Sequence, residues 1–450
     1  MRGCILLSTA PRLRFAPQSP PPPVLDLKLI RQSPDLIREG ARKKRIAVDL
    51  EGLLRVDAEA RAVQTEVDNL RARQNALSKE VGKAAADKRQ ALIAEVNSFK
   101  AQLAAGEERL RALQADLDAR LLRIPNVPAA EVPEGKDDSE NVEVKRVGEP
   151  RKFDFEALDH VALAEAQGWL EIERAARLSG SRNYVLKGDL SLLETAVMRY
   201  ALDLMVERGF TPLSVPTLVR SEIMVGTGYF PGGEDQAYRC DERDDLCLVG
   251  TAEVPVTALH KDEIFKLEEL PIRYVALSSC YRREAGAAGR DTRGLYRVHQ
   301  FQKVEQVVLD VADEARSIEH HANIVDNAER LLQSLELPYR IVNVCGGDLG
   351  APQVQKFDIE TWMPSRGGYG ETHSASRFGE YQARRLGLRY RDSEGKVRFC
   401  HTLNNTVAAS ARMLIAILEN HQQRDGTVRV PAPLQPYLRG RSVLGRAVRS

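Results

Sequence analysis

The chain has 450 residues, more than a single ordinary hydrophobic core takes, so two or more structural units are expected. Hydrophobic residues make up 43% and charged residues 29%, a balance that is typical of globular proteins and excludes a wholly disordered chain. The net charge is only +1, which excludes a uniformly basic protein that wraps nucleic acid, so any RNA contact must come from local patches.

Residues 1–25 differ in composition from everything that follows. They carry three arginines, no acidic residue and a run of four prolines at 20–23. The apolar stretch 4–7 is too short for a secretory signal. An organellar transit peptide, a disordered extension and an over-long start all stay open, with the last two favoured, and the segment is left out of the fold prediction.

Two heptad runs predict a long helical hairpin in residues 26–130. Apolar residues recur at spacings of three, four or seven at Val56, Ala60, Val63, Val67, Leu70, Leu77 and Val81, and again at Leu92, Val96, Phe99, Leu103, Leu110, Leu113 and Leu117. An average spacing of 3.5 residues is typical of a coiled coil. The segment Gly82–Asp87 is short enough to reverse the chain, so we expect an antiparallel pair roughly 50 Å long. The polar stretch 131–150 is interpreted as a linker.

Charge is distributed unevenly along this hairpin. Residues 71–100, around the tip, contain seven basic and three acidic residues, whereas the stalk has six basic and nine acidic ones. A basic tip suits the phosphate backbone of RNA. A solvated helical face or a dimerisation coil stays the alternative. The candidate contact residues at the tip are Arg71, Arg73, Lys79, Lys83, Lys88 and Arg89.

Residues 151–438 are expected to form one α+β domain. Short strand-like runs alternate with helical ones from Gly180 onward, without the regular βαβ rhythm of a parallel sheet, so a largely antiparallel sheet flanked by helices is predicted. Neither a P-loop nor a strand–Gly-x-Gly-x-x-Gly–helix unit is present. If this domain handles ATP, it must do so with arginines and carboxylates on a sheet.

Two predicted strands joined by a long loop carry such a set. The first strand runs through Cys280–Gly286, the loop holds Arg290, Asp291 and Arg293, and the chain returns through 296–307. Period-2 alternation is expected to place Arg282 and Glu284 on one face of the first strand. It likewise places Arg297, Phe301 and Glu305 together on the second. A salt-bridged surface hairpin is the alternative.

Phe301 and Glu305 lie about 13 Å apart along an extended strand. That distance is enough to hold a base at one end and a small amino-bearing group at the other. Arg282 could clamp a phosphate between them, because a guanidinium fork matches phosphate oxygens.

A second group of polar residues precedes the helix predicted at 408–422. Asn404 and Thr406 fall on one face of the strand His401–Val407 and offer hydrogen-bonding groups. Arg412 sits in the early turns of the helix, where a basic residue does not complement the macrodipole. We therefore expect an anionic partner for Arg412.

The cysteines and hydropathy indicate the compartment. Six cysteines are too few and too scattered for a disulfide scaffold, so reduced thiols and a cytoplasmic location are expected. No apolar run approaches the roughly 18 residues that span a bilayer, so no membrane segment is predicted. Cys240 and Cys247 with His260 or Cys280 have unusual spacing for a zinc site, and no zinc is predicted.

Six motifs in order, behind the hairpin, resemble those of the seryl-tRNA synthetases, a family of class II aminoacyl-tRNA synthetases. The first three match the class motifs, and the last three match the serine branch: Gly209–Pro216, Tyr281–Glu305, Leu403–Asn420, Thr251–Glu253, Gly370–Ser374 and Val428–Pro431. The resemblance covers Leu25 to Leu438. It implies a class II catalytic domain at 151–438 behind a tRNA-binding arm.

The resemblance also implies roles for single residues. Arg282 and Arg412 would be the catalytic arginines, with Arg282 on the α-phosphate and the serine carboxylate. The ATP site would comprise Arg282, Arg283, Glu284, Arg297, Val298, Phe301, Glu371, Thr372, His373, Ser374 and Arg412. The serine site would comprise Thr251, Ala252, Glu253, Arg282, Glu305, Asn404 and Thr406. Glu371 and Ser374 would bind Mg²⁺.

The implied activity is that of a serine–tRNA ligase. It would join L-serine and ATP into seryl-adenylate and pyrophosphate, then pass serine to the terminal ribose of tRNA(Ser), with tRNA(Sec) left open as a second acceptor. A homodimer built on the first motif is implied. A non-catalytic relative that binds RNA or regulates is the alternative, and the intact arginines and carboxylates count against it.

Some positions depart from the family pattern. Asn405, Thr406 and Val407 stand where many relatives carry Gly-Ser-Gly, so a tighter serine pocket is expected. Arg377 stands where an Asn is common. Residues 439–450 form an arginine-rich tail without an acidic residue, interpreted as a frayed solvated end, with a tRNA contact as the alternative.

Overall fold

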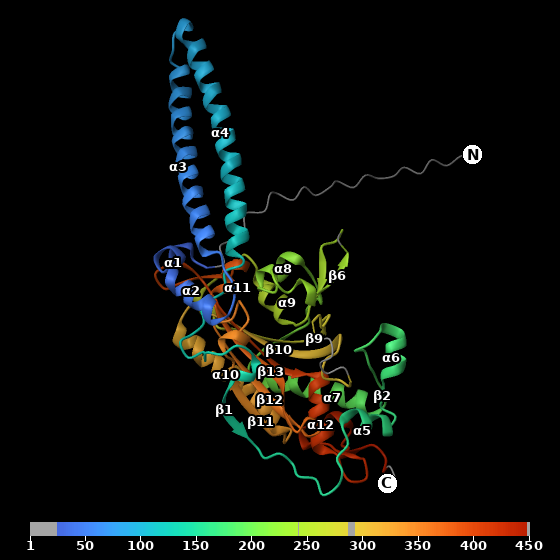
Figure 1. The fold of residues 1–450 in the computed structure, drawn as a ribbon. Helices are drawn as coiled ribbons and strands as arrows, with labels where there is room; N and C mark the ends of the chain where they lie inside the picture. The colour runs from blue at the N-terminus through green and yellow to red at the C-terminus, as the bar shows by residue number, and fades with distance from the viewer. Residues whose placement is uncertain (1–24, 242, 287–292, 448–450) are drawn as a thin grey trace, which may run out of the picture.

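A long two-helix arm rises from a compact body in the computed structural model, which describes residues 25–241, 243–286 and 293–447 (Figure 1). The predicted leader up to residue 24, the loop residues Arg290 and Asp291 and the last three residues of the tail lie outside the described residues.

The arm confirms the predicted antiparallel hairpin. Two short helices, α1 (Leu27–Gln32) and α2 (Pro34–Lys43), precede α3 (Leu50–Val81) and α4 (Ala86–Leu121). The Asp49 carboxylate caps α3 by accepting the backbone N–H of Gly52. In α3 the heptad residues Val56, Ala60, Val63 and Val67 are all buried, Val67 fully so. The coiled-coil seam therefore forms where the 3.5-residue spacing predicts it.

The base of the arm is fixed to the body by backbone carbonyls. Lys44, which is 3% exposed, donates its ammonium hydrogens to the carbonyl oxygens of Gly350, Ala351 and Gln353 at 2.6 to 3.1 Å. On the body side, Arg385 donates to the carbonyl of Leu122, at the end of α4, at 3.0 Å. These hydrogen bonds offset the free-energy cost of burying the Lys44 ammonium and the Arg385 guanidinium.

The body is built on an eight-stranded sheet with the order β1-β11-β12-β13-β16-β10-β9-β4. All neighbours pair antiparallel except β4 and β9, which confirms the predicted antiparallel α+β class. In sheet order the strands are β1 (Val142–Val147), β11 (Tyr339–Asn343), β12 (Gln355–Met363), β13 (Gly368–Gly379), β16 (His401–Ala409), β10 (Gln300–Asp310), β9 (Ile272–Tyr281) and β4 (Thr211–Leu213).

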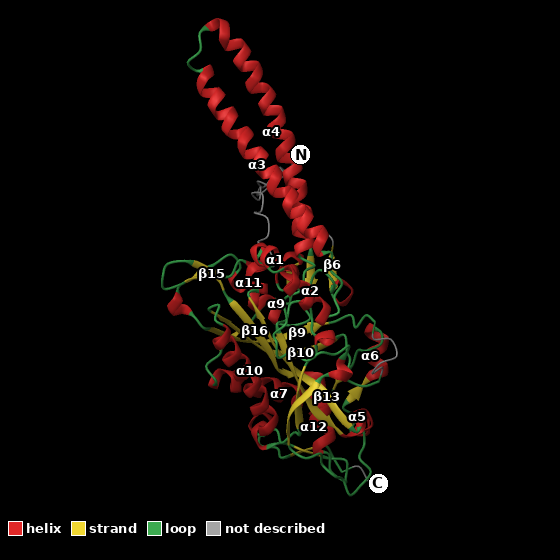
Figure 2. Cartoon of the chain, turned by 60° about the vertical axis from the view of Figure 1, so that its left-hand side comes forward, coloured by secondary structure: helices red, strands yellow, loops and turns green. Residues whose placement is uncertain are grey.

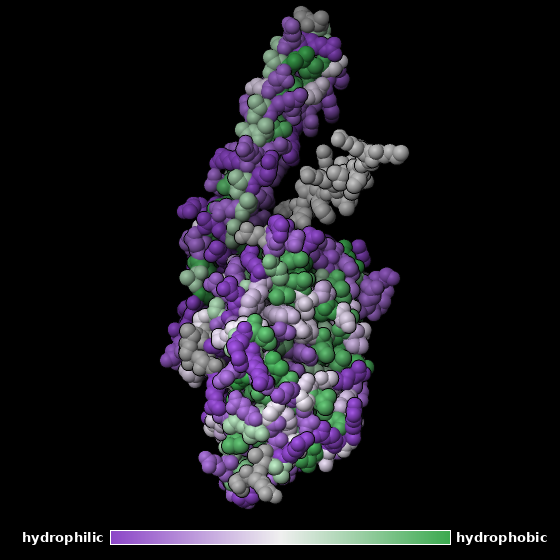
Figure 3. Space-filling model, turned by 90° about the vertical axis from the view of Figure 1, so that its right-hand side faces the viewer, coloured by the Kyte–Doolittle hydropathy of each residue, from purple (hydrophilic) through white to green (hydrophobic). Residues whose placement is uncertain are grey.

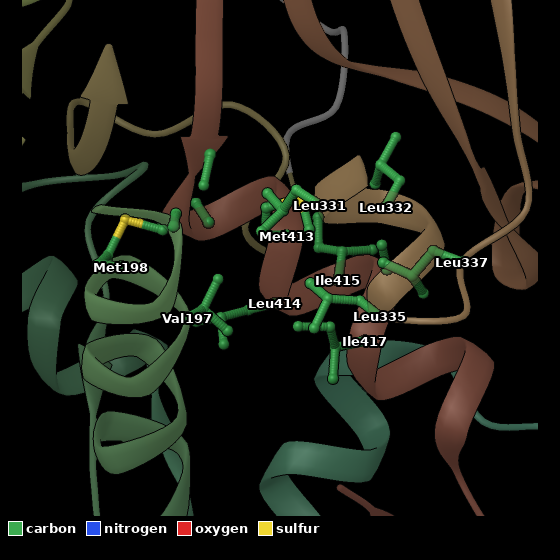
Figure 4. Close-up of a cluster of buried hydrophobic side chains, with 14 of the residues drawn as sticks. Val197, Met198, Leu331, Leu332, Leu335, Leu337, Met413, Leu414, Ile415 and Ile417 are labelled. Atoms are coloured by element: carbon green, nitrogen blue, oxygen red, sulfur yellow. The ribbon is translucent and has the colours of Figure 1, made fainter. Parts of the chain in front are cut away.

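Helices cover both faces of this sheet (Figure 2). On one face lie α7 (Asp189–Glu207), α10 (Glu314–Ser334) and α12 (Ser410–His421), and their apolar side chains form the largest core (Figure 4). On the other face lie α9 (Glu253–Thr257) and α11 (Tyr381–Leu386), over a smaller core. Alternation along β10 divides its side chains accordingly, because Val304 and Val308 enter the first core and Val307 and Leu309 the second.

Smaller elements surround the body. The remaining helices are α5 (His160–Ala166), α6 (Ile172–Ser179) and α8 (Ser221–Gly226). The remaining strands are β2 (Leu170–Glu171), β3 (Val185–Leu186), β5 (Leu218–Arg220), β6 (Tyr238–Asp241), β7 (Leu246–Leu248), β8 (Ile264–Phe265), β14 (Arg389–Arg391), β15 (Val397–Phe399), β17 (Val428–Arg429) and β18 (Val443–Leu444).

Two segments are more ordered than the sequence predicts. The expected linker 131–150 contributes β1, whose exposed alternating side chains give no sign of burial although its backbone pairs with β11. The expectation of a frayed tail is wrong for residues 439–447. Arg441 donates to both carboxylate oxygens of Asp189 at 2.7 and 2.6 Å, and Leu444 is buried in β18. Backbone pairing and a bidentate ion pair hold this tail on the body.

Candidate active site

Two adjoining cavities form one cleft on the face of the sheet that α9 covers. They share four lining residues, Arg282, Glu284, Glu371 and Arg412, and the larger cavity has a volume of about 530 Å³. Phe301, Lys303 and Thr406 line the inner cavity, and Tyr229 and Arg297 line the outer one. The two predicted catalytic arginines, far apart in sequence, therefore meet in the same space.

Arg282 enters the cleft directly after the end of β9. Its Nε donates to the carbonyl of Gly250 at 3.3 Å, and its guanidinium lies 5.4 Å from the centre of the Phe301 ring. Glu284 also lines the cleft, but not for the predicted reason. The strand ends at Tyr281, and Glu284 has a positive φ of 50°, so a turn rather than strand alternation brings the two side chains together. Arg297 lies 3.3 Å from the Glu284 carboxylate.

Arg412 has the anionic partner that its place in α12 predicts. Its Nη1 donates to the backbone carbonyl of Glu371 at 2.8 Å and lies 3.3 Å from the Glu371 carboxylate. The guanidinium also stacks 4.6 Å from the centre of the Tyr296 ring. Burial opposes ionisation of Glu371, yet Arg412, with Lys356 and Arg282, holds the pKa of this carboxyl below its usual value.

Two buried carboxylates, neither of which lines the two cavities itself, contact residues that line the cleft. Glu305, on β10, is 1% exposed, accepts from the Thr406 hydroxyl at 3.4 Å and is paired with the Lys303 ammonium. Glu253, at the start of α9, is 7% exposed and accepts from the Tyr229 hydroxyl at 3.0 Å and from Gln382 Nε2 at 2.8 Å. Burial, and next the charge of Glu305, raise the pKa of Glu253 to about 7.

Two of the three departures around Thr406 point away from this pocket. Asn405 points to the opposite face of the sheet, where its Nδ2 donates to the carbonyl of Ile324 in α10 at 2.6 Å. Val407 also faces that side and lies in the largest core. Of the three replaced positions, only Thr406 reaches the cleft. Arg377 is buried and ion-paired with Glu314, which accounts for a cation at that position.

Several predicted ATP or serine residues lie at or beyond the margin of the cleft. Arg283 is exposed and lines neither cavity. His373 is buried beside the Thr372 hydroxyl, and burial lowers its pKa to about 4. Val298 and Thr372 line the inner cavity, whereas Asn404 is buried in β16 and Ala252 in the smaller core. The Thr251 hydroxyl accepts the backbone N–H of Glu253 at the start of α9.

The sequence prediction missed Lys303, Tyr229, Tyr296 and Gln382. Strand alternation could have identified Lys303, because it lies between Phe301 and Glu305 on the same strand face. Tyr229 and Gln382 come from loop and helix segments whose approach to Glu253 depends on tertiary packing, so no local pattern marks them.

The two residues predicted to bind Mg²⁺ lie on one strand, but only Glu371 lines the cleft. Glu371 borders both cavities, whereas the Ser374 hydroxyl is hydrogen-bonded to Asp358 and lines neither of them. Mg²⁺ in nucleotide sites is usually bound by one or two carboxylates together with substrate phosphates. Among the described residues, no three His, Cys, Asp or Glu side chains are grouped so that they could hold a metal ion.

The predicted tRNA-contacting residues all project from the arm near its tip, and each side chain is exposed. Arg71 is ion-paired with Glu107 at 2.6 Å, so part of its charge is neutralised within the arm. The other five residues, Arg73, Lys79, Lys83, Lys88 and Arg89, form no ion pair with another described side chain. Their charge is therefore available to a partner.

Known proteins match the chain along nearly its full length. The family model of the seryl-tRNA synthetase N-terminal domain matches residues 24–128, and that of the tRNA synthetase class II core domain (G, H, P, S and T) matches residues 238–421. The serine–tRNA ligase of Deinococcus radiodurans is 52% identical over 426 residues, covering 95% of this chain and 100% of the relative. That of Rubrobacter xylanophilus is 43% identical over 427 residues, with 95% and 100% coverage.

A solved structure agrees with this result. The crystal structure of seryl-tRNA synthetase from Pyrococcus horikoshii, complexed with ATP, superposes with a TM-score of 0.86 at 38% identity, covering 94% of this chain and 99% of that one. With its helical hairpin and arginine-lined cleft, the chain belongs to the serine–tRNA ligase family.

Proposed function

We propose that the cleft forms seryl-adenylate from L-serine and ATP and then transfers serine to the 3′-terminal ribose of tRNA(Ser). The observation that carries this proposal is the convergence of Arg282, Arg412 and Phe301 on one cavity, whose lining residue Lys303 is paired with Glu305. The Pyrococcus horikoshii relative was solved with ATP, which supports the same nucleotide here. An assay of serine transfer to tRNA tests whether tRNA(Sec) is a second acceptor.

The reaction needs positioning and neutralisation of charge rather than a protein nucleophile. A serine carboxylate oxygen attacks the α-phosphorus, the bond to the bridging oxygen breaks, and pyrophosphate leaves. Arg282 binds the α-phosphate and the serine carboxylate, which it brings together. Arg412 and Arg297 bind the outer phosphates, where negative charge accumulates as pyrophosphate departs.

The remaining residues bind the two ends of the reacting pair. The Phe301 ring stacks on the adenine, which Glu284 and the backbone at Val298 recognise. Glu305 holds the serine ammonium, and Thr406 and Glu253 complete the pocket. Glu371, with Ser374, would hold Mg²⁺, which supplies further neutralisation of the phosphates when bound. In the second step the ribose hydroxyl attacks the serine carbonyl and AMP leaves.

The first prediction tests this activity directly. Serine, with ATP and Mg²⁺, is expected to support ATP–pyrophosphate exchange, and alanine is expected to be about 10⁴-fold poorer in kcat/KM because it leaves buried hydrogen-bonding groups unpaired. A panel of serine, alanine, threonine and cysteine in the exchange assay provides the measurement. Folded protein that binds tRNA but exchanges with no amino acid would favour the non-catalytic alternative.

A homodimer is the second prediction. Leu192 and Val206, near opposite ends of α7, are 53% and 44% exposed, and among the described residues the β4 strand that follows α7 pairs only with β9 and so ends the large sheet. On the face shown in Figure 3 the body exposes apolar patches, whereas the arm is mainly polar. Light scattering is expected to give twice the chain mass of 50.1 kDa. Leu192→Glu is expected to raise the dimer Kd by about 30-fold or more.

The matched control for the dimer is Leu36→Glu. Leu36 is 45% exposed, close to the 53% of Leu192, but it lies on α2 at the base of the arm. The Leu36→Glu variant is expected to leave the dimer intact. Equal dissociation by both variants, or a wild-type mass of one chain, would contradict an interface on α7.

The compartment is part of the proposal as well. None of the described helices combines the length and the apolar character of a membrane span. Five cysteines there, Cys240, Cys247, Cys280, Cys345 and Cys400, are free thiols, the state that a reducing compartment maintains. We place the enzyme in the cytoplasm because of these thiols.

A further inference from the structure

A buried histidine at the start of α5 holds the backbone of a segment that lines the cleft. His160 is 8% exposed, and its Nε2 accepts the backbone N–H of Leu295 at 3.2 Å. Leu295 is fully buried and directly precedes Tyr296, which lines the inner cavity, and Arg297, which lines the outer one. The hydrogen bond therefore fixes the backbone immediately before two side chains of the cleft.

A buried carboxylate on α12 fixes the other ring nitrogen of His160. Nδ1 lies 2.7 Å from Oε1 of Glu419, which is fully buried. Because Nε2 accepts the hydrogen bond from Leu295, the ring hydrogen is on Nδ1 and is donated to Glu419. Burial opposes ionisation of Glu419, yet hydrogen bonds from His160 and Ser365 hold the pKa of this carboxyl below its usual value. Glu419 thereby sets both the orientation and the tautomer of the ring.

The same helix holds the segment a second time, through Arg412. Arg412 and Glu419 are seven residues apart on α12, about two turns, so both side chains leave the same face of the helix. Nε of Arg412 donates to the backbone carbonyl of Tyr296 at 3.4 Å. One face of α12 therefore fixes two consecutive residues, the N–H of Leu295 through His160 and the carbonyl of Tyr296 directly.

The two residues before Leu295 also pack against the start of α5. Arg293 is paired with the Asp159 carboxylate at 3.3 Å. Gly294 has a φ of 83°, and a Cβ on it would overlap Nε2 of His160. Glycine is thus the residue that allows the backbone to approach the ring so closely. Three consecutive residues, 293–295, meet the start of α5.

We propose that His160 is a positioning residue of the ATP site, because it holds the Leu295 backbone so that Arg297 meets the outer phosphates. This inference rests on the proposed function of the cleft, in which Arg297 binds those phosphates. The α-phosphate and the adenine are assigned to Arg282 and Phe301, at the paired ends of β9 and β10. Loss of the hydrogen bond from Leu295 is therefore expected to weaken the hold on the outer phosphates alone.

The test compares His160→Asn and His160→Gln with wild-type protein. The amide nitrogen of asparagine can take the place of Nδ1 and donate to Glu419, but asparagine is too short to accept from Leu295. The amide oxygen of glutamine can take the place of Nε2 and accept from Leu295. By calorimetry, His160→Asn is expected to raise the Kd of ATP about tenfold or more, whereas His160→Gln is expected to stay within about threefold of wild type.

AMP separates this role from a merely structural one. It carries the adenine and the α-phosphate but lacks the outer phosphates, so its Kd is expected to stay within about threefold of wild type in both variants. In serine-dependent exchange, His160→Asn is expected to lower kcat/KM for ATP about tenfold or more and to leave KM for serine within about threefold.

The matched control is His421→Asn. His421 is 2% exposed, and its Nε2 donates to the carbonyl of Leu335 at 2.9 Å, a bond that asparagine is also too short to make. His421 lines neither cavity of the cleft. His421→Asn is therefore expected to leave the ratio of the ATP and AMP Kd values unchanged.

Other outcomes overturn the inference. An unchanged ATP Kd in His160→Asn would remove His160 from the ATP site. Equal weakening of ATP and AMP, or an ATP loss in His160→Gln as large as in His160→Asn, would assign it to structure alone.

A second variant and the wild-type protein complete the test. If His160→Asn does not fold, Gly294→Ala displaces the ring instead, and the same loss of ATP with AMP retained is expected. Failure of both variants to fold would assign His160 to structure alone. Wild-type protein without exchange would contradict the proposed function together with the inference, whereas wild-type exchange beside unaltered variants would contradict the inference only.

Discussion

Replacing Arg282 by Ala is expected to lower kcat/KM for serine-dependent ATP–pyrophosphate exchange by about 10³-fold or more. The side chain is assigned to both the attacking carboxylate and the α-phosphate, so its loss removes positioning and neutralisation together. Because Arg282 lines both cavities and its Nε bonds only to one carbonyl, that of Gly250, the variant is expected to unfold at a similar denaturant concentration. Exchange kinetics and urea unfolding provide the two measurements.

Two further variants sharpen this result. Arg282→Lys keeps the charge but loses the planar fork. Its kcat/KM for exchange is therefore expected to fall about 10- to 100-fold, a smaller loss than that of Arg282→Ala. Arg273→Ala is the matched control, because Arg273 lies on the same strand, β9, and is exposed away from the cleft. Unchanged exchange by Arg282→Ala, or an equal loss in Arg273→Ala, would remove Arg282 from the phosphate role.

The parts of the molecule that follow local periodicity could be predicted from the sequence. The hairpin was predictable because Val56, Ala60, Val63 and Val67 repeat at 3.5-residue spacing and one seam buries them all. The antiparallel pairing of β9 with β10 followed from two strand-like runs separated by a polar loop. The alternation of Phe301 and Glu305 on β10 placed the two ends of the cleft on one face.

Features that depend on distant contacts were not predictable. The polar strand β1 forms because β11 offers an open edge, and no side-chain burial marks its sequence. Arg441 holds the tail through Asp189, a partner 252 residues away. Two features of the site were also not predictable from local spacing, because tertiary packing determines them. They are the positive φ of Glu284 and the hydrogen bond from Gln382 to Glu253.

The second prediction with a large expected effect concerns the helical arm. Deleting residues 71–100 and closing the gap with a short Gly-Ser turn is expected to leave serine-dependent exchange within about threefold of wild type and to lower transfer of serine to tRNA by about 10³-fold. The exchange is spared because the cleft is built entirely from the body. The stalk is expected to keep its register, since the ion pairs Arg109–Glu59 and Arg120–Asp49 lie below the cut.

A charge-neutral tip separates electrostatic contact from mere length of the arm. Replacing Arg73, Lys79, Lys83, Lys88 and Arg89 by Gln keeps both helices but removes five charges that no described side chain pairs. If these residues meet phosphates, tRNA binding weakens and the slope of log K against log salt falls by about 0.7 to 0.9 for each lost contact. Arg55→Gln with Arg111→Gln, on the exposed stalk, is the control and is expected to change neither. A tip variant with unaltered salt dependence would show that the arm acts through its shape, whereas equal losses of exchange and transfer after the deletion would contradict a separate tRNA-contacting arm.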